Sequence, residues 1–306
     1  GLCPSDCCVP GPRCRPDSQR FLNTPSLHGP FLVPTSGPER CLDLTVKSLD
    51  GDISARVLVP NSFERKRPPL VVLHGIGRDA DAMEQAFGDD AVAAGRVLIC
   101  PRFAEEDWPV FQRIDRARPD RALLALFAEV RATLSLQSGQ VELFGFSGGA
   151  QLAHRFAMLL PHCVARLHIA SPGWFCLPDT GAAFPAGLAD APVKRRRSPG
   201  VASAMRAQIA NYLRLPVQVY VGSKDTMNDQ ALRNDPVIDA TQGVNRRERA
   251  ETYVHHFKKA ATARGISPNI GLTLLKNCSH DFIQCAKQAA LPQLVLASHP
   301  NPETKP

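Results

Sequence analysis

The pentapeptide at 145–149, Gly-Phe-Ser-Gly-Gly, constrains the fold of this chain more than any other feature of its sequence. It follows the apolar run 141–144 directly and leads into a helical pattern over 150–158. Glycine is needed on both sides of the serine because a bulkier residue in so sharp a turn would clash with the neighbouring strand and helix. Such a turn projects the serine hydroxyl above a sheet, beside the free N–H groups of a helix start. The pattern predicts a strand, a tight turn and a helix, with Ser147 as a candidate nucleophile.

Short apolar runs alternate with amphipathic helices along most of the chain. Eight runs are candidate strands: 42–46, 55–59, 70–73, 97–100, 141–144, 167–170, 217–221 and 272–275. Several are continuously apolar, as expected for strands that are buried on both faces of a parallel sheet. The alternation predicts an α/β fold with a mostly parallel sheet of about eight strands, helices on both faces and right-handed crossovers.

Two of the expected helices carry boundary signals. Asp120 is a candidate N-cap for a helix that runs to about Leu136. The apolar stripe of that helix is Leu123, Phe127, Val130 and Leu134. Asn245 and Glu248 have the spacing of a capping box, and they begin a helix that ends at Gly265.

A second motif, His74-Gly75-Ile76-Gly77, follows the apolar run 71–73. Together with the pentapeptide, it resembles the strand and His-Gly oxyanion loop of the α/β-hydrolase superfamily. The resemblance covers roughly residues 42–292. Within the superfamily, the chain is most similar to the secreted esterase and polyester-depolymerase-like branch with compact caps. The stretches 170–174 and 242–249 resemble a little-characterised bacterial subset of that branch. The resemblance implies an α/β-hydrolase fold with a short cap insertion.

In this fold the catalytic groups follow one another in the order serine, acid, histidine. His280 lies in the loop after the last predicted strand and is the expected general base; the alternative is a local hydrogen bond at a helix start. Asp225 follows the run 217–221 and is the expected acid, which would fix the imidazole tautomer. Asp229 and Asp235 are the fallbacks, and all three aspartates also suit turns and helix caps.

Two backbone N–H groups are expected to form an oxyanion hole. One belongs to Gly148, the residue after the nucleophile, and by resemblance the other belongs to Ile76. The side chain at 76 is only weakly diagnostic, since the donor is a backbone group. The alternatives are an ordinary strand-end turn at 74–75 and a glycine-rich turn without chemistry at 145–149.

An insertion at about 171–214 follows the strand after the nucleophile helix, where hydrolases of this class place a cap. Trp174 and Phe175 are candidates for a substrate pocket or for packing within the cap. Trp108 is a further pocket candidate. The basic run 194–197 is expected to be a solvated face rather than a site for an anionic partner.

Composition and missing motifs narrow the function. Hydrophobic residues make up 44% of the 306 residues, which argues against global disorder, and no apolar run approaches the length of a transmembrane helix. The net charge is +7, but the basic residues are scattered along the chain and do not indicate a nucleic-acid-binding surface. The sequence contains no H-E-x-x-H, G-x-G-x-x-G or P-loop motif, so we expect neither a metal nor another cofactor.

The chain is expected to divide into a leader at 1–40, a hydrolase domain at 41–296 and a tail at 297–306. The leader holds eight prolines and four of the ten cysteines, and we expect it to be dispensable for chemistry unless a disulfide ties it to the domain. Cys100 is expected to be a buried free thiol, and Cys278 and Cys285 are candidates for a pair. The sequence does not determine the cellular compartment, although it slightly favours a secreted or periplasmic location over the cytoplasm. It does not determine the oligomeric state either.

The leading hypothesis is a serine hydrolase that cleaves carboxylic esters, small or polymeric, through an acyl-enzyme. An acyltransferase, or a peptidase or amidase, would use the same residues with a different acceptor or leaving group. A non-catalytic binding protein on the same fold is the competing class. Serine, acid and histidine in the correct order speak against it, while the substrate and its acyl length stay open.

Overall fold

We describe the fold from a computed structural model, which covers residues 40–114, 116–190 and 200–297. The predicted leader (but for Arg40), the basic run 194–197 and the tail from 298 lie outside the described residues. The strands are β1 (Arg40–Lys47), β2 (Asp52–Val59), β3 (Leu70–Leu73), β4 (Leu98–Arg102), β5 (Val141–Phe146), β6 (Val164–Ala170), β7 (Val217–Gly222) and β8 (Ile270–Leu275). The helices are α1 (Ala80–Ala93), α2 (Pro119–Thr133), α3 (Gly148–Leu159), α4 (Val201–Tyr212), α5 (Pro236–Gln242), α6 (Arg246–Thr262), α7 (Phe282–Gln288) and α8 (Leu291–Leu296), with a 3-10 turn at Pro161–Cys163.

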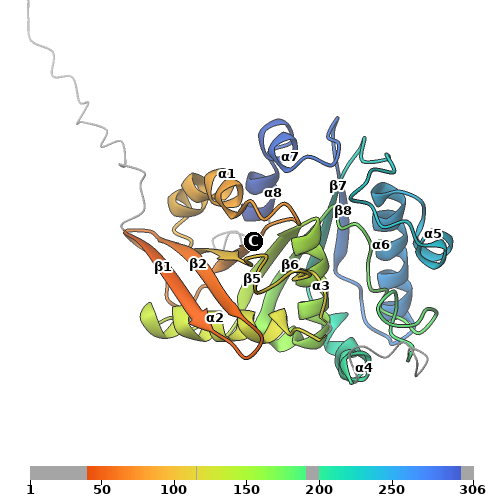
Figure 1. The fold of residues 1–306 in the computed structure, drawn as a ribbon, viewed down its shortest axis with the longest axis horizontal. Helices are drawn as coiled ribbons and strands as arrows, with labels where there is room; N and C mark the ends of the chain where they lie inside the picture. The colour runs from red at the N-terminus through yellow and green to blue at the C-terminus, as the bar shows by residue number, and fades with distance from the viewer. Residues whose placement is uncertain (1–39, 115, 191–199, 298–306) are drawn as a thin grey trace, which may run out of the picture. The chain divides into compact units, whose positions relative to one another are not determined.

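The strands form one eight-stranded sheet in the order β1-β2-β4-β3-β5-β6-β7-β8 (Figure 1). β2 runs antiparallel to both β1 and β4, and every pair from β4 to β8 is parallel. All eight predicted strands are therefore present, and the mostly parallel α/β sheet is confirmed. In the four central parallel strands the carboxyl ends lie along one edge, which is where open α/β sheets place their sites.

Two apolar layers enclose the sheet. Residues of β3 alternate between them, because successive side chains of a strand point to opposite faces. Leu70 and Val72 pack in the layer that contains residues of α1, α7 and α8, whereas Val71 and Leu73 pack in the layer that contains residues of α2, α3, α4 and α6. The continuously apolar strands of the sequence follow from this double burial.

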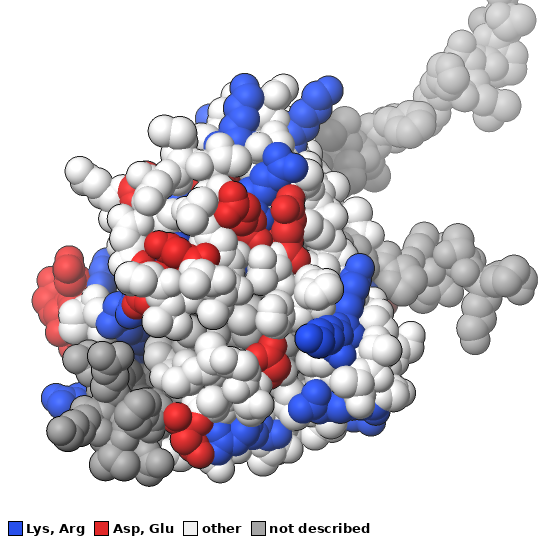
Figure 2. All heavy atoms as spheres, turned by 90° about the vertical axis from the view of Figure 1, so that its right-hand side faces the viewer, with Lys and Arg blue, Asp and Glu red and all other residues white. Residues whose placement is uncertain are grey.

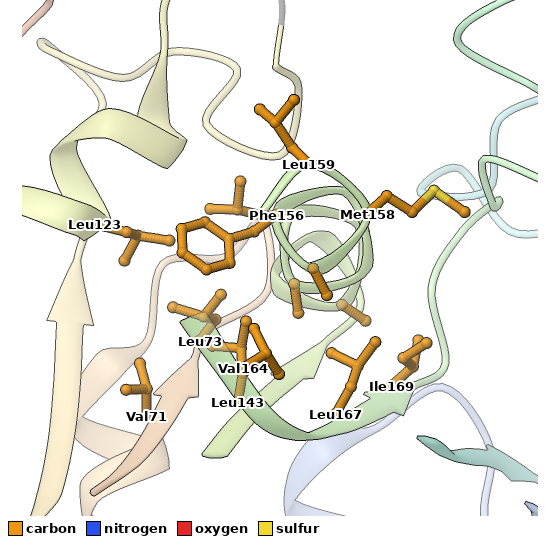
Figure 3. Packing of buried hydrophobic residues seen from close by; sticks show 14 of the residues in the cluster. Val71, Leu73, Leu123, Leu143, Phe156, Met158, Leu159, Val164, Leu167 and Ile169 are labelled. Atoms are coloured by element: carbon orange, nitrogen blue, oxygen red, sulfur yellow. The ribbon is translucent and has the colours of Figure 1, made fainter. Parts of the chain in front are cut away.

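Helix α3 packs at the centre of the second layer. Figure 3 shows it above Leu73, Leu143 and Leu167, with Phe156 pointing toward Leu123. All twelve residues of α3 are buried, so this helix is fixed to the sheet along its whole length. Its first residue follows Ser147, and the position of the candidate nucleophile is set by that packing.

The helix boundaries agree with the sequence at one predicted cap and differ at the other. The Asn245 side chain caps α6 by accepting a hydrogen bond from the backbone N–H of Glu248. Asp120 is not the cap of α2, because that helix begins at Pro119 and the Asp120 carboxylate instead accepts two hydrogen bonds from the Arg118 guanidinium. Helix α2 also ends at Thr133 rather than near Leu136.

The predicted insertion at 171–214 consists of two different parts. Residues 171–190 form an irregular segment after β6, whereas α4 packs beside α3 as the connecting helix that leads to β7. A second irregular segment, which the sequence did not predict, runs from 223 to 235 and ends in α5. The two segments meet at a small apolar cluster of Trp174, Ala182, Ala186 and Ile238. We call 171–190 and 223–242 together the cap.

Charges of both signs are interspersed on the face shown in Figure 2, where Lys and Arg alternate with Asp and Glu. This agrees with the scattered charge of the sequence. Among the described residues, no helix is both long enough and apolar enough to cross a membrane.

Candidate active site

Four loops at the carboxyl ends of β3, β5, β7 and β8 carry the predicted catalytic residues and oxyanion donors. Ser147 follows β5 immediately, Asp225 lies three residues after β7 and His280 lies five residues after β8. The structure brings these three side chains into one hydrogen-bonded chain. Their separation in the sequence is bridged by the parallel strand order, since β7 and β8 are neighbours and β6 lies between them and β5.

Ser147 occupies a strained turn, with φ of 53° and ψ of −112°, a conformation that L-residues rarely adopt. The glycines around it allow this turn. A Cβ on Gly145 would lie 2.3 Å from the carbonyl oxygen of Gly149, and a Cβ on Gly149 would lie 2.3 Å from that of Leu73. The backbone N–H of Ser147 donates to Ala170 O at 2.8 Å, which ties the turn to β6.

His280 lies between Ser147 and Asp225. Its Nε2 is 3.0 Å from Ser147 Oγ and its Nδ1 is 3.1 Å from Asp225 Oδ2. The ring of Phe146 stacks on the imidazole with centroids 5.2 Å apart and planes 20° apart. Because Phe146 is the last residue of β5, the strand that presents the serine also supports the histidine.

Backbone hydrogen bonds join the acid loop to the histidine loop. Lys224 N donates to Cys278 O at 2.9 Å, and Asn277 N donates to Ser223 Oγ at 2.9 Å. Gly222 lies against this junction, where a Cβ would be 2.3 Å from Cys278 O. The two loops are thereby held in register, which fixes the distance from Asp225 to the imidazole.

The predicted oxyanion donors lie next to each other. A Cβ on Gly148 would be 3.2 Å from Ile76 N and 2.7 Å from Ile76 Cγ2. Gly148 N–H is at the start of α3, and neither it nor the N–H of Ile76 has an acceptor among the described residues. Two free backbone donors therefore lie close together next to Ser147.

The loop that carries Ile76 is anchored from behind by His74. The His74 Nε2 accepts a hydrogen bond from Phe103 N at 3.2 Å, and its Nδ1 lies 2.8 Å from Gly75 O. Burial lowers the pKa of His74, so the ring is neutral and can accept that bond. His74 is therefore a structural residue, while Ile76 keeps its side chain 47% exposed beside Gly148.

The three predicted pocket residues are buried in the structure. Trp108 packs in the core against Phe103 and donates from Nε1 to Asp52 O, and Phe175 stacks on Tyr253 with centroids 4.2 Å apart. Trp174 is 3% exposed. Sequence cannot separate an aromatic that lines a pocket from one that fills a core, and here core packing of these side chains is what the structure shows.

Trp174 lies between two guanidinium groups. The Arg155 and Arg233 Cζ atoms are 4.3 Å and 4.9 Å from the centroid of its ring. Burial lowers the pKa of Arg155 to about 10, and the nearby charge of Arg233 acts in the same direction. The indole therefore stacks against one cation of α3 and one of the cap and does not present a free apolar surface.

The described cysteines are free thiols. Cys100 is buried, as predicted, and burial raises its pKa well above the ordinary value. Cys278 and Cys285 are both buried and form no disulfide; the Cys278 thiol donates to the carbonyl oxygens of Lys276 and Gln284, and the Cys285 thiol donates to that of Ser279. Among the residues that the structure covers, no group of three or more His, Cys, Asp and Glu side chains could hold a metal ion.

The sequence did not identify the residue that contacts the acid from the other side. Arg246 Nη1 lies 3.3 Å from Asp225 Oδ1 and 2.6 Å from Asp229 Oδ2. Asp229, the fallback acid, thus binds Arg246, and the guanidinium holds the pKa of that carboxyl at about 2. The stretch 242–249 was the available signal, since it places Arg246 directly after the helix cap.

Comparisons with known proteins show what the fold of this chain is similar to. No family model matches the sequence, and no curated protein matches it either. Among solved structures, poly(aspartic acid) hydrolase-1 from Sphingomonas sp. KT-1 is 23% identical, with a TM-score of 0.70 over 83% of this chain and 98% of that one. LpqC, a poly(3-hydroxybutyrate) depolymerase from Bordetella parapertussis, is also 23% identical, with a TM-score of 0.69 over 84% and 89% of the two chains.

The chain has the α/β-hydrolase fold. Brefeldin A esterase, a bacterial homologue of human hormone-sensitive lipase, is a more distant match, 19% identical with a TM-score of 0.51 over 86% of this chain and 76% of that one. At these identities the likeness establishes the hydrolase fold. The chemistry has to be argued from the residues of this chain.

Proposed function

We propose that this protein is a serine hydrolase that cleaves carboxylic esters. The observation that carries the proposal is the chain of contacts from Ser147 Oγ through the imidazole to Asp225, with distances of 3.0 Å and 3.1 Å. The depolymerase and esterase with similar structures support an ester substrate, because they share the fold on which this constellation lies.

The proposed reaction starts with Ser147 Oγ attacking the ester carbonyl carbon while His280 Nε2 takes the hydroxyl proton. Asp225 accepts a hydrogen bond from Nδ1–H, which holds the tautomer that leaves Nε2 free as a base. The tetrahedral oxyanion accepts hydrogen bonds from the N–H groups of Ile76 and Gly148.

Collapse of this intermediate expels the alkoxide, which takes the proton from His280 and leaves an acyl group on Ser147. Water then attacks the acyl carbonyl with His280 again acting as the base, and release of the acid restores the serine. The exposed side chain of Ile76 borders the oxyanion site, which supports an apolar group in the substrate.

The test compares two serines at the ends of neighbouring strands. Ser171 follows β6 and is buried like Ser147, but its hydroxyl has no hydrogen-bond partner among the described residues. We expect Ser147→Ala to lower kcat/KM for nitrophenyl esters by at least ~1000-fold without unfolding the protein. Ser171→Ala is expected to stay within about threefold of the wild type, because it removes no interaction.

A fluorophosphonate probe provides a second readout that needs no substrate. It should label the wild type and Ser171→Ala but not Ser147→Ala. Absence of labelling in the folded wild type would favour a non-catalytic binding protein, and a Ser147→Ala variant with more than about a tenth of wild-type turnover would refute the assigned nucleophile. A series of esters of rising acyl length, with the matching anilides, separates esterase from amidase activity.

A further inference from the structure

The first turn of α6 holds a guanidinium between two carboxylates. Arg246 Nη1 contacts Asp225 Oδ1 at 3.3 Å, and its Nη1 and Nη2 bind Asp229 as a bidentate pair at 2.6 Å and 2.9 Å. The Arg246 side chain is fully buried, and that of Asp225 is 1% exposed. Asp225, the proposed acid, therefore contacts the imidazole through Oδ2 and the Arg246 guanidinium through Oδ1.

Local sequence explains why this arginine lies there. The Asn245 side chain caps α6, and the Glu248 carboxylate accepts hydrogen bonds from the Asn245 side-chain amide and from Val244 N. The cap fixes Arg246 as the first residue of the helix. The backbone N–H of Arg247 then donates to Asp225 O at 3.3 Å, so the helix start holds both the backbone and the side chain of the acid.

Charge determines what this arrangement does to the histidine. Asp225 and Asp229 carry two negative charges, and Arg246 compensates one of them. Arg246 disfavours a proton on the imidazole and Asp229 favours one, because like charges repel and opposite charges attract. The charge of Asp229 and that of His280 do influence each other. The other charged groups on the two loops are Lys224, Arg233, Asp235, Lys276 and Asp281, and Cys278 and Cys285 are buried in the adjoining apolar layer.

We propose that Arg246 is the positioning residue of the catalytic acid, and that Asp229 and Arg246 act in opposite directions on the pH at which the histidine becomes a base. This inference rests on the proposed triad. Asp225 Oδ2 stays directed at the imidazole because Oδ1 is bound from the opposite side. The buried guanidinium compensates part of the negative charge that Asp225 presents to the imidazole.

The proposal predicts opposite effects of two substitutions on the acidic midpoint of kcat/KM. Arg246→Met removes a positive charge and is expected to raise the midpoint by about 1 pH unit. Asp229→Asn removes a negative charge and is expected to lower it by about half a unit. Arg246→Lys keeps the charge but loses the bidentate geometry, so its midpoint should stay near the wild type. We also expect Arg246→Met to lower plateau kcat/KM by about 10- to 100-fold through misplacement of the acid.

The same helix offers a matched control. Arg249 is as buried as Arg246 and lies three residues later, but it binds Asp239 at 2.6 Å and the carbonyl oxygen of Gly243 at 2.9 Å rather than Asp225. Arg249→Met removes an equally buried arginine and should leave the midpoint within about 0.2 unit of the wild type. A purely structural role of Arg246 would give both arginine variants the same pH profile.

The experiment measures pH profiles of nitrophenyl-ester turnover on the full chain, and in parallel the titration of the His280 imidazole by NMR, assigned with His280→Asn. Midpoints that move up for Arg246→Met and down for Asp229→Asn support the proposal. Midpoints that both stay unchanged, or that move the same way, overturn it. If Arg246→Met does not fold, Asp229→Asn still tests the proposal, because the Asp229 side chain is 36% exposed and tolerates substitution. An unchanged or raised midpoint in Asp229→Asn then overturns the proposal. If the wild type shows no turnover, but the NMR midpoint of His280 still moves up in Arg246→Met and down in Asp229→Asn, the proposed function is refuted and the charge arrangement is supported.

Discussion

Replacing Gly149 with alanine adds one methyl group at one of the most crowded points of the described fold. Its Cβ would lie 2.3 Å from the carbonyl oxygen of Leu73 and 2.5 Å from that of His74. A carbon and an oxygen that are not bonded need about 3.2 Å or more, so α3 and β3 would have to separate by roughly 0.7–0.9 Å. Both obstacles are backbone oxygens, one in the last residue of β3 and one in the residue after it, and no side-chain rotation can relieve the clash.

The cost follows from what this separation disrupts. Overpacking a core costs typically about 1–3 kcal/mol and more where the backbone has to shift. Here the shift loosens a fully buried helix from the strand beneath it, so we expect Gly149→Ala to lower the free energy of unfolding by about 3 kcal/mol or more. A domain of this size loses about 2–4 °C in Tm for each kcal/mol, which corresponds to about 6–12 °C.

Gly88→Ala is the matched control, because it makes the same chemical change within α1. Its Cβ would meet only Leu58 Cδ2, at an ordinary contact distance of 3.5 Å. Alanine is favoured over glycine inside a helix, so this variant should be about 0.5–1 kcal/mol more stable than the wild type.

Urea unfolding of the three proteins, followed by circular dichroism, measures both effects as shifts of the midpoint at constant slope. The reasoning is refuted if Gly149→Ala unfolds within about 1 kcal/mol of the wild type, or if Gly88→Ala is the less stable of the two. An insoluble Gly149→Ala beside a soluble Gly88→Ala would agree with the expected order.

Two further predictions concern α3. Phe156→Ala removes a fully buried ring that meets Phe127 edge-on, and it should lower the free energy of unfolding by about 3–5 kcal/mol. Phe156→Leu keeps most of the apolar volume and should lower it by no more than about 1.5 kcal/mol. Complete burial lowers the pKa of His154 well below its ordinary value, so the unfolded chain binds a proton below about pH 6.5 that the folded chain does not. Stability should therefore be fully present above that pH and fall by about 2 kcal/mol between pH 7 and pH 5, and a His154→Gln variant that unfolds with the same pH slope as the wild type would contradict this origin.

The predictions from sequence hold where residues act through local pattern and chain order. The eight strands are apolar runs because the sheet is covered on both faces, and the serine, aspartate and histidine come together because the fold dictates where their loops lie. The structure buries the three pocket candidates, Trp108, Trp174 and Phe175, and the sequence could not distinguish a pocket role from core packing. A tryptophan in an irregular segment gains as much from burial in the cap as from contact with a ligand, and the sequence carries no sign of which occurs.

The partner of the acid depends on contacts that no local pattern reveals. Arg246 and Asp229 are 17 residues apart, and they meet because α6 begins beside the loop that follows β7. The prediction that Asp120 caps α2 was also wrong, in this case because of its immediate neighbours in the sequence. Proline at the first position of α2 starts the helix two residues earlier, and Arg118 then binds the carboxylate that would have capped it.

Helix α6 serves the cap and the acid with side chains one turn apart. Arg249 donates to Gly173 O in one cap segment and, at 3.1 Å, to Arg233 O in the other, while Arg246 holds Asp225. The first turn of α6 thereby holds both the cap and the acid in place. A ligand that displaces the cap from the sheet also displaces this turn, which positions Asp225 against the imidazole. Room for a bulkier substrate therefore comes with poorer alignment of Asp225 and His280. Selection for broader substrates would therefore act on the Arg249 contacts before it changed any residue of the proposed triad.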